Sequence, residues 1–161
     1  MYIGVFAAFV GLGFYIWRGY KCRKVFFQNI LDFSQHLLVE ISFSKSTVRS
    51  IIDRYGQSYG AHFREVLNGY QALLDEKADI TRERIETLVW KKIKKSERQC
   101  ITDFFYELGR HGASEERQKI ENRKITFDTF FNDADKALRR DASIYLKLFI
   151  LLGVGVVIIL I

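Results

Sequence analysis

The chain has 161 residues and a net charge of +6, and it contains no proline and two cysteines. All 25 basic and 19 acidic side chains lie between Arg18 and Lys147, so two apolar ends flank a charged middle. The length suits one ordinary domain, the lack of proline disfavours turn-rich β structure, and two cysteines exclude a disulfide framework.

The first apolar end, residues 1–17 (MYIGVFAAFVGLGFYIW), predicts a membrane span. A helix of this length covers about 25 Å at ~1.5 Å per residue, slightly less than the ~30 Å hydrocarbon core. Trp17 at the interface and a snorkelling Arg18 close the difference. A cleaved signal peptide is the alternative, and the missing charged n-region and missing A-x-A-like site argue against it.

From residue 18 onward the apolar residues recur at helical spacing, so we expect helices throughout the charged middle. The first helix should continue to about residue 43 along an apolar stripe formed by Phe26, Ile30, Phe33, Leu37 and Ile41. Shorter helices are expected over about 46–55, 58–76, 79–93 and 96–108. Their expected N-cap residues are Ser46, either Asp79 or Thr81, and Ser96. Helix ends are expected at three glycines, Gly56, Gly109 and Gly112.

A last long helix is expected to begin near Ser114, where Glu115 and Glu116 suit the positive end of its dipole. It continues without a stop signal into the second apolar end, residues 145–161 (YLKLFILLGVGVVIILI). This end predicts a second membrane span, and a buried core helix is the alternative. Gly153 and Gly155 lack the GxxxG spacing, so they are weak evidence for a specific helix contact.

Basic residues flank both apolar ends on the inner side only, at Arg18, Lys21, Arg23, Lys24, Lys136, Arg139, Arg140 and Lys147. The positive-inside rule then places the middle of the chain in the cytoplasm and both termini outside. The predicted fold class is all-α, a six-helix antiparallel bundle. Its domains are a cytoplasmic bundle over residues 18–144 and two transmembrane spans, 1–17 and 145–161, formed by the long first and last helices.

The usual motifs of catalysis are missing from the sequence. It has no GxxxxGK[ST] phosphate loop, no HExxH zinc motif and no G-x-S-x-G nucleophile elbow. His36, His62 and His111 are far apart in the sequence and are typical of ordinary surface or core histidines. We therefore expect no enzymatic activity, no metal, no cofactor and no small-molecule substrate.

The most distinctive polar feature is a basic patch made of Lys91, Lys92, Lys94, Lys95 and Arg98. On a helix the four lysines would span roughly 160° and Ile93 would face the other way, so the pattern predicts a basic face on an amphipathic helix. A solvated surface explains the patch equally well. The functional alternatives are docking of an acidic partner and contact with anionic lipid. Nucleic acid is disfavoured because no recognition motif accompanies the lysines.

Two stretches carry a family resemblance. Residues 37–41 (LLVEI) are similar to a Leu-x-x-Glu-Ile stretch, and residues 105–118 (FYELGRHGASEERQ) to a Leu-Gly, second Gly, Ser-Asp and Gln pattern. With the two apolar ends in the same order, the chain resembles the stage III sporulation protein AB family over nearly its whole length. The resemblance implies structural roles for Glu40, Gly109, Gly112 and Gln118.

The chain departs from that family pattern at three places. His111 stands where a leucine is usual, Glu115 replaces an aspartate, and Ser46-Thr47-Val48 replaces a Thr-Pro-Leu-like helix start. These departures indicate a divergent member with the same fold.

The resemblance implies a helical domain similar to the F-type platform proteins of type II secretion and type IV pilus machines. It implies a place in the channel complex between mother cell and forespore, in the outer forespore membrane facing the mother cell. The expected partners are a cytoplasmic secretion-type ATPase, other membrane proteins of the complex, and membrane lipid. The expected function is a non-catalytic platform that docks this ATPase to the membrane channel.

Two other functions stay open on the sequence. The first is an F-type platform relative in a pilus or secretion system, although such proteins repeat the helical domain and this chain has one copy in 161 residues. The second is a membrane-tethered binder of nucleic acid or lipid surfaces that uses the lysines of the basic patch, for which steeply salt-dependent binding would be the sign.

Overall fold

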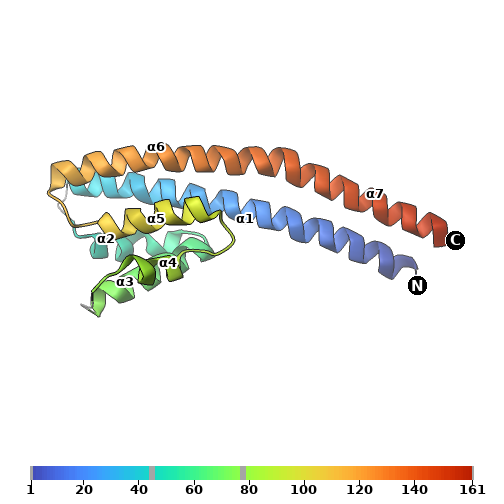
Figure 1. Cartoon of the computed structure of the whole chain (residues 1–161), viewed down its shortest axis with the longest axis horizontal. Coiled ribbons are helices and arrows are strands. Elements are labelled where there is room, and N and C mark those ends of the chain that lie inside the picture. The colour runs from blue at the N-terminus through green and yellow to red at the C-terminus, as the bar shows by residue number, and fades with distance from the viewer. Residues whose placement is uncertain (1, 44–45, 77–78, 161) are drawn as a thin grey trace. The chain divides into compact units, whose positions relative to one another are not determined.

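Figure 1 shows a computed structural model of the chain, which describes residues 2–43, 46–76 and 79–160. All regular structure among these residues is helical, which confirms the predicted all-α class. The elements are α1 (Tyr2–Phe43), α2 (Val48–Tyr55), the 3₁₀ turn η1 (Gly56–Ser58), α3 (Ala61–Asp75), α4 (Arg82–Leu88), α5 (Lys95–Glu107), α6 (Ala113–Ala137), the π-helical η2 (Leu138–Ala142) and α7 (Ser143–Leu160). Because α6, η2 and α7 follow one another without a break, the described residues form six helical rods.

The chain divides into two compact units. The terminal unit comprises Met1–Val25 and Phe131–Ile161, and the central unit is Phe26–Phe130. Both α1 and α6 contribute residues to each unit, so neither unit is an independent stretch of sequence. Each unit is described separately below.

In the terminal unit, two glycines lie at close contacts between α1 and α7. A Cβ atom added at Gly13 would lie 3.2 Å from the Phe149 Cβ, and one at Gly153 would lie 3.2 Å from the Phe9 Cβ. The later residue of α1, Gly13, contacts the earlier residue of α7, Phe149, and the earlier residue of α1, Phe9, contacts the later residue of α7, Gly153. This order is that of two antiparallel helices. Gly155 has no neighbour within 4 Å, so Gly153 alone of this glycine pair makes a specific helix contact, which its spacing did not indicate.

Charged side chains of the terminal unit also pair between its two segments. Lys24 Nζ lies 2.7 Å from Asp135 Oδ1, and Arg139 Nε lies 2.8 Å from Asp135 Oδ2. The hydrogen bond from Lys24, with help from Arg139, lowers the pKa of Asp135 below its usual range. Two of the basic residues expected to set the topology are therefore ion-paired close to η2.

The apolar second end lies in a helix that is long enough to cross a membrane. Among the described residues one helix passes a test of length and composition for a span, the continuous Ala113–Ile159 of 47 residues. Its apolar window is only 11% buried, so it is not a covered core helix of this chain. This is weak evidence for membrane association, and the first span over residues 1–17 stays a prediction.

The central unit is built around buried aromatic rings. Phe33 packs on Phe63 and on Phe105, with ring centroids 5.7 and 6.1 Å apart, and all three side chains are fully buried. Tyr70 lies 5.0 Å from Phe105, and Phe26 lies 5.7 Å from Phe63. Because each fully buried aromatic side chain contributes about 1.5–3 kcal/mol, this cluster is the main source of the unit's stability.

The structure corrects the helix expected over residues 79–93. Helix α4 ends at Leu88, and a loop of residues 89–94 separates it from α5. The lysines of the basic patch therefore lie on a loop and on the start of α5, not on one face of a helix. Like charges three and four positions apart repel one another in a helix, and Glu97 Oε2 accepts the Lys94 N–H at 3.0 Å. That bond makes Lys94 the N-cap of α5, two positions before Ser96, the expected N-cap residue.

Other expected helix boundaries are close to the observed ones. Thr81 caps α4 as expected by accepting the Arg84 N–H at 3.4 Å. Thr47 caps α2 in place of Ser46, because the Ser46 hydroxyl is donated elsewhere. The carbonyl of Gly112, not Ser114, accepts the first helical N–H of α6, from Glu116 at 2.9 Å.

The glycines expected at helix ends behave differently from one another. Gly109 has φ +80° directly after α5, which is the left-handed conformation of a C-terminal cap. Gly56 has φ −56°, so it continues from α2 into η1 without a left-handed cap. A Cβ at Gly112 would meet open space, so nothing in its surroundings requires a glycine there.

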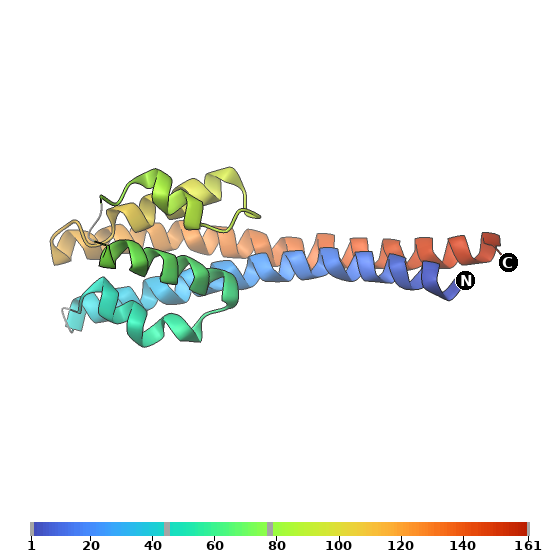
Figure 2. The same cartoon turned by 90° about the horizontal axis from the view of Figure 1, so that it is seen from below.

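Helix α5 separates two ends of the central unit, which we name the loop end and the motif end. The loop end holds the α4–α5 loop and Phe26, and the motif end holds the α5–α6 connection and Ile41. Figures 1 and 2 both show these two connections at opposite ends of α5. Phe26 packs 5.7 Å from Trp90 at the loop end, while Ile41 and Gly109 line one cleft at the motif end.

Candidate functional site

The motif end is organised around the buried carboxylate of Glu40, which is 6% exposed. Its Oε1 accepts from Arg54 Nη1 at 2.6 Å and from the Tyr55 hydroxyl at 3.2 Å, and its Oε2 accepts from the Ser46 hydroxyl at 2.9 Å. A buried carboxylate is stable only when such donors replace water. Glu40 thus ties the end of α1 to Ser46, which precedes α2, and to the last turn of α2.

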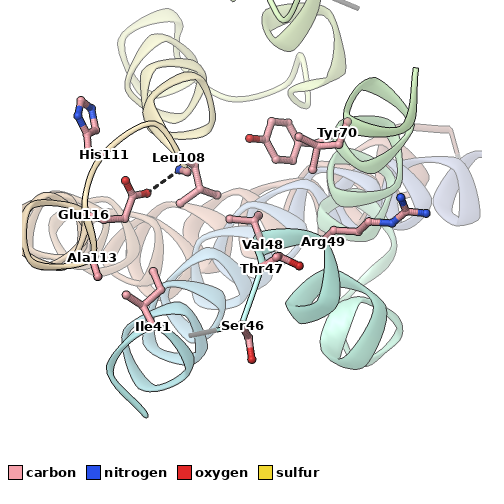
Figure 3. A pocket seen from close by; sticks show the side chains of 12 residues that line it. Ile41, Ser46, Thr47, Val48, Arg49, Tyr70, Leu108, His111, Ala113 and Glu116 are labelled. Atoms are coloured by element: carbon pink, nitrogen blue, oxygen red, sulfur yellow. Dashed lines mark hydrogen bonds between the residues drawn. The ribbon is translucent and has the colours of Figure 1, made fainter. Parts of the chain in front are cut away.

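A second carboxylate, Glu116, ties α6 to the connection that precedes it. Its Oε1 accepts the Gly109 N–H at 2.8 Å, and Figure 3 shows the side chain turned toward that backbone. Glu116 is 6% exposed, and its Oε2 is buried with no hydrogen-bond partner among the described atoms. A buried oxygen that is left unpaired costs about 1–3 kcal/mol.

Glu116 and Ser46, the hydroxyl partner of Glu40, both line an open cleft of about 560 Å³. The ends of α1 and α5, the start of α2 and α6, and one face of α3 form its walls. The lining residues are Ile41, Ser46, Thr47, Val48, Arg49, Tyr70, Leu74, Leu108, Gly109, His111, Ala113 and Glu116. Both stretches that carried the family resemblance therefore contribute to one concave surface.

Tyr70 contributes the deepest polar group of this cleft. Its hydroxyl points toward Leu108, and its side chain is 2% exposed (Figure 3). Burial raises the pKa of Tyr70 to about 12, Arg110 opposes that shift, and the charge of Glu116 adds to it. The phenol is therefore a neutral hydrogen-bonding group at physiological pH and does not act as a base.

The remaining motif residues have weaker structural roles. Gln118 is exposed on the first turns of α6, and Gly112 is exposed in the α5–α6 connection. His111 is half-buried, with its Nε2 2.7 Å from Lys119 Nζ and its Nδ1 3.4 Å from Glu115 Oε1. Among the described residues no group of three or more potential metal ligands comes together.

The basic patch lies at the opposite end of α5. Lys91, Lys92, Lys94 and Lys95 are all exposed, whereas Val89 and Ile93 are buried and anchor the loop. Arg98, the fifth residue of the predicted docking patch, is turned back on the loop. Its Nη2 donates to the Lys91 carbonyl at 3.4 Å, and its Nη1 lies 3.9 Å from Glu86. Arg98 therefore braces the loop while the lysines face solvent.

Sequence reasoning missed three residues that shape the motif end. Glu116 was interpreted as a helix-dipole partner, and neither Tyr70 nor Arg54 had an assigned role. A signal existed for Glu116, since it stands seven positions after a glycine that was expected to end a helix. No local pattern links Arg54 to Glu40, because 14 positions and a change of helix separate them.

Comparison with known proteins gives one family. No curated protein and no solved structure matches this chain. The family model for stage III sporulation protein AB matches residues 1–161, which is the full length of the chain. The match covers both motif stretches that converge on the cleft and both apolar ends. The chain therefore belongs to the stage III sporulation protein AB family, a family of sporulation proteins.

Proposed function

We propose that this protein is a non-catalytic membrane platform of the sporulation channel between mother cell and forespore, and that it docks a secretion-type ATPase to that channel. The full-length family match is the observation that carries the proposal. The family resemblance supplies the channel and the ATPase as partners. The sequence has none of the usual catalytic motifs, which is consistent with a non-catalytic role.

The proposed topology is a membrane hairpin. Spans over residues 1–17 and 145–161 hold a cytoplasmic six-helix antiparallel bundle, and the membrane is the outer forespore membrane facing the mother cell. Support comes from the uncharged ends, from the basic flanks at Arg18 and Lys147, and from the close contacts at Gly13 and Gly153. Small residues at helix contacts are typical of spans that pair within a membrane.

The motif end is the better candidate for the ATPase. None of the residues that line the cleft belongs to either apolar end of the sequence. A cytoplasmic ATPase needs a surface that the membrane does not cover. The cleft offers apolar walls with the Tyr70 hydroxyl and Glu116 as polar groups, which is typical of binding sites.

Two experiments test the proposal in sporulating cells. Deletion of the gene should block spore development at a late stage, and chemical crosslinking should recover the full-length protein with the ATPase. Normal sporulation of the deletion strain, together with no ATPase crosslink, would remove the platform function.

The topology has its own test in sealed vesicles that carry tagged protein. Tags at both termini should be protected from protease on the cytoplasmic side, while the central unit should be digested. Digestion of the central unit from the outer face would overturn the hairpin.

A further inference from the structure

The α4–α5 loop and the start of α5 present exposed lysines without an ionic partner. We call Lys91, Lys94 and Lys95 the loop lysines. No acidic side chain of the described residues pairs with them. On the neighbouring helix α4, by contrast, Arg82 Nε lies 2.9 Å from Asp103 Oδ1, and Arg84 Nη2 lies 2.7 Å from Glu76 Oε2. The loop lysines are therefore a positive charge that their surroundings leave unbalanced.

The fold of the loop does not depend on this charge. Ile93 is buried under the loop, and Arg98 Nη2 donates to the Lys91 carbonyl at 3.4 Å. Glu97 accepts the backbone N–H of Lys94, which nearly any residue at that position would offer. The ammonium groups meanwhile repel one another and stand near the positive end of the α5 dipole. Because these cations oppose folding and brace nothing, we assign their charge to contact with an anionic partner.

Exposed carboxylates limit the extent of this positive surface. Trp90 stacks on His62, and the Glu65 carboxylate, 75% exposed, lies 4.0 Å from the His62 ring. Glu86, whose side chain is 48% exposed, lies 3.9 Å from Arg98, which binds the loop backbone. Nucleic acids and membranes carry phosphate over areas larger than one loop, so either would also meet these carboxylates. A short acidic segment of a protein can place its charges on the lysines alone.

Trp90 adds an apolar contact beside the lysines. Its ring lies 4.5 Å from that of His62 and 5.7 Å from that of Phe26, so neighbouring rings fix its position. The side chain is only half-buried, so part of it stays open to a partner. Tryptophan is among the residues that contribute most to protein–protein binding. A protein segment uses both parts of this surface, the charges and the ring.

We propose that the loop lysines, together with Trp90, bind an acidic segment of a partner protein that carries apolar side chains among its carboxylates. The lysines attract the segment, and the ring of Trp90 packs on one of its apolar side chains. This site lies at the opposite end of α5 from the connection that lines the cleft (Figures 1 and 2). It therefore goes beyond the proposed function, as a site for a second partner, and it depends neither on the membrane topology nor on the ATPase.

The test uses the full-length protein in micelles of a neutral detergent and a fluorescein-labelled peptide that repeats Glu-Glu-Leu. Fluorescence anisotropy measures the affinity. Changing the three loop lysines to Gln should weaken binding roughly tenfold, because three exposed ion pairs are lost. About 1 M salt should remove binding to the unchanged chain. No binding of the peptide to the unchanged chain at low salt would overturn the proposal.

The matched control changes Arg117, Lys119 and Lys124 of α6 to Gln. It removes the same net charge and should leave the affinity within about twofold of the unchanged chain. Circular dichroism checks that both triple variants keep their helices. Equal weakening in the two variants would overturn the proposal, because binding would then follow net charge and not the loop.

The two tryptophans of the chain give a second readout. In the full-length Trp17→Phe variant, Trp90 is the only tryptophan, and its emission should shift when the peptide binds. A peptide with Gln in place of Glu should cause no shift. Unchanged emission while the acidic peptide binds would place the peptide elsewhere and overturn the proposal.

Competitors matched in negative charge separate a protein partner from a phosphate-bearing one. A DNA duplex, or micelles that contain phosphatidylglycerol, should displace the peptide only at a higher concentration of charge, because Glu65 and Glu86 repel extended arrays of phosphate. Displacement by either competitor at an equal or lower concentration of charge would assign the loop lysines to nucleic acid or to lipid, and would overturn the proposal.

Discussion

The two ends of the central unit both hold connections between helices, but they use different side chains: buried carboxylates at the motif end, and exposed lysines above buried apolar residues at the loop end. At the motif end, Glu40 and Glu116 are buried carboxylates that accept hydrogen bonds across two connections, α1–α2 and α5–α6. At the loop end, lysines stay in solvent, and buried apolar residues such as Ile93 fix the backbone. The motif end therefore has a cleft with buried, hydrogen-bonded carboxylates, and the loop end is a surface of exposed lysines.

Because of this difference, substitutions at the motif end should mainly affect folding stability, and substitutions at the loop end should mainly affect binding. Removing a buried carboxylate leaves several donors without a partner, and the cost appears in folding. Removing an exposed lysine leaves no buried group unpaired, so its effect on folding is small. The predictions below begin with the core shared by both ends and finish with the lysines.

The largest effect is expected at Phe105, which packs on Phe33, Phe63 and Tyr70 between the two ends. Phe105→Ala should lower the free energy of unfolding by about 3–5 kcal/mol, because a large cavity replaces the ring. Phe105→Leu should cost less, since it keeps most of the apolar volume. Denaturant unfolding of the full chain in detergent measures both variants, and hydrogen exchange should show both ends loosened together.

At the motif end, Glu40→Gln should lower the free energy of unfolding by about 3 kcal/mol, since Arg54, Tyr55 and Ser46 lose a charged acceptor. Hydrogen exchange should rise in the last turn of α2 and stay unchanged in α5 near the loop end. Glu65→Gln is the control, because the Glu65 side chain is 75% exposed and should matter by less than about 0.5 kcal/mol. Equal effects of the two changes would show that Glu40 does not hold the motif end together.

The pH dependence of stability should reveal Tyr70. Its pKa is about 12 in the folded chain and ordinarily about 10, so the folded state holds the phenolic proton more tightly. This contribution is fully present below pH ~10 and is lost as pH rises toward ~12, by about 2–3 kcal/mol in total. Unfolding measured across this window should flatten in Tyr70→Phe relative to the unchanged chain. An identical decline in both proteins would place Tyr70 in water, outside the cleft.

The smallest effect is expected at the loop end. Changing Lys94 and Lys95 together to Gln should change the free energy of unfolding by less than about 0.5 kcal/mol, and in the stabilising direction, because two cations leave the positive end of α5. Thermal unfolding in detergent checks this prediction. A loss larger than that in Glu40→Gln would reverse the contrast between the two ends.

The sequence predicted the helical class and most helix boundaries, because apolar residues such as Phe26, Ile30 and Phe33 recur at helical spacing and are all buried. It failed at residues 89–94, where Val89 and Ile93 also fit a helical stripe but are buried from a loop. Periodicity cannot distinguish these cases, since the decision depends on repulsion between lysines and on the capping bond from Glu97.

The motif end could be predicted only in part. The family resemblance implied structural roles for Glu40 and Gly109; in the structure Glu40 accepts a hydrogen bond from Arg54, and Gly109 has a positive φ. The cleft itself depends on the meeting of segments that are more than 60 positions apart, such as Ile41 and Leu108. Such long-range proximity follows from the packing of the aromatic core, and no local pattern records it.

The most direct test of the contrast between the ends uses a photo-crosslinking amino acid in sporulating cells. One strain carries it at position 111 of the motif end, and a second carries it at position 92 of the loop end, each in the full-length protein. The ATPase should crosslink from position 111 and not from position 92. A crosslink to the ATPase from position 92 alone would contradict the account, because the basic loop would then be the docking site and the motif end would be free.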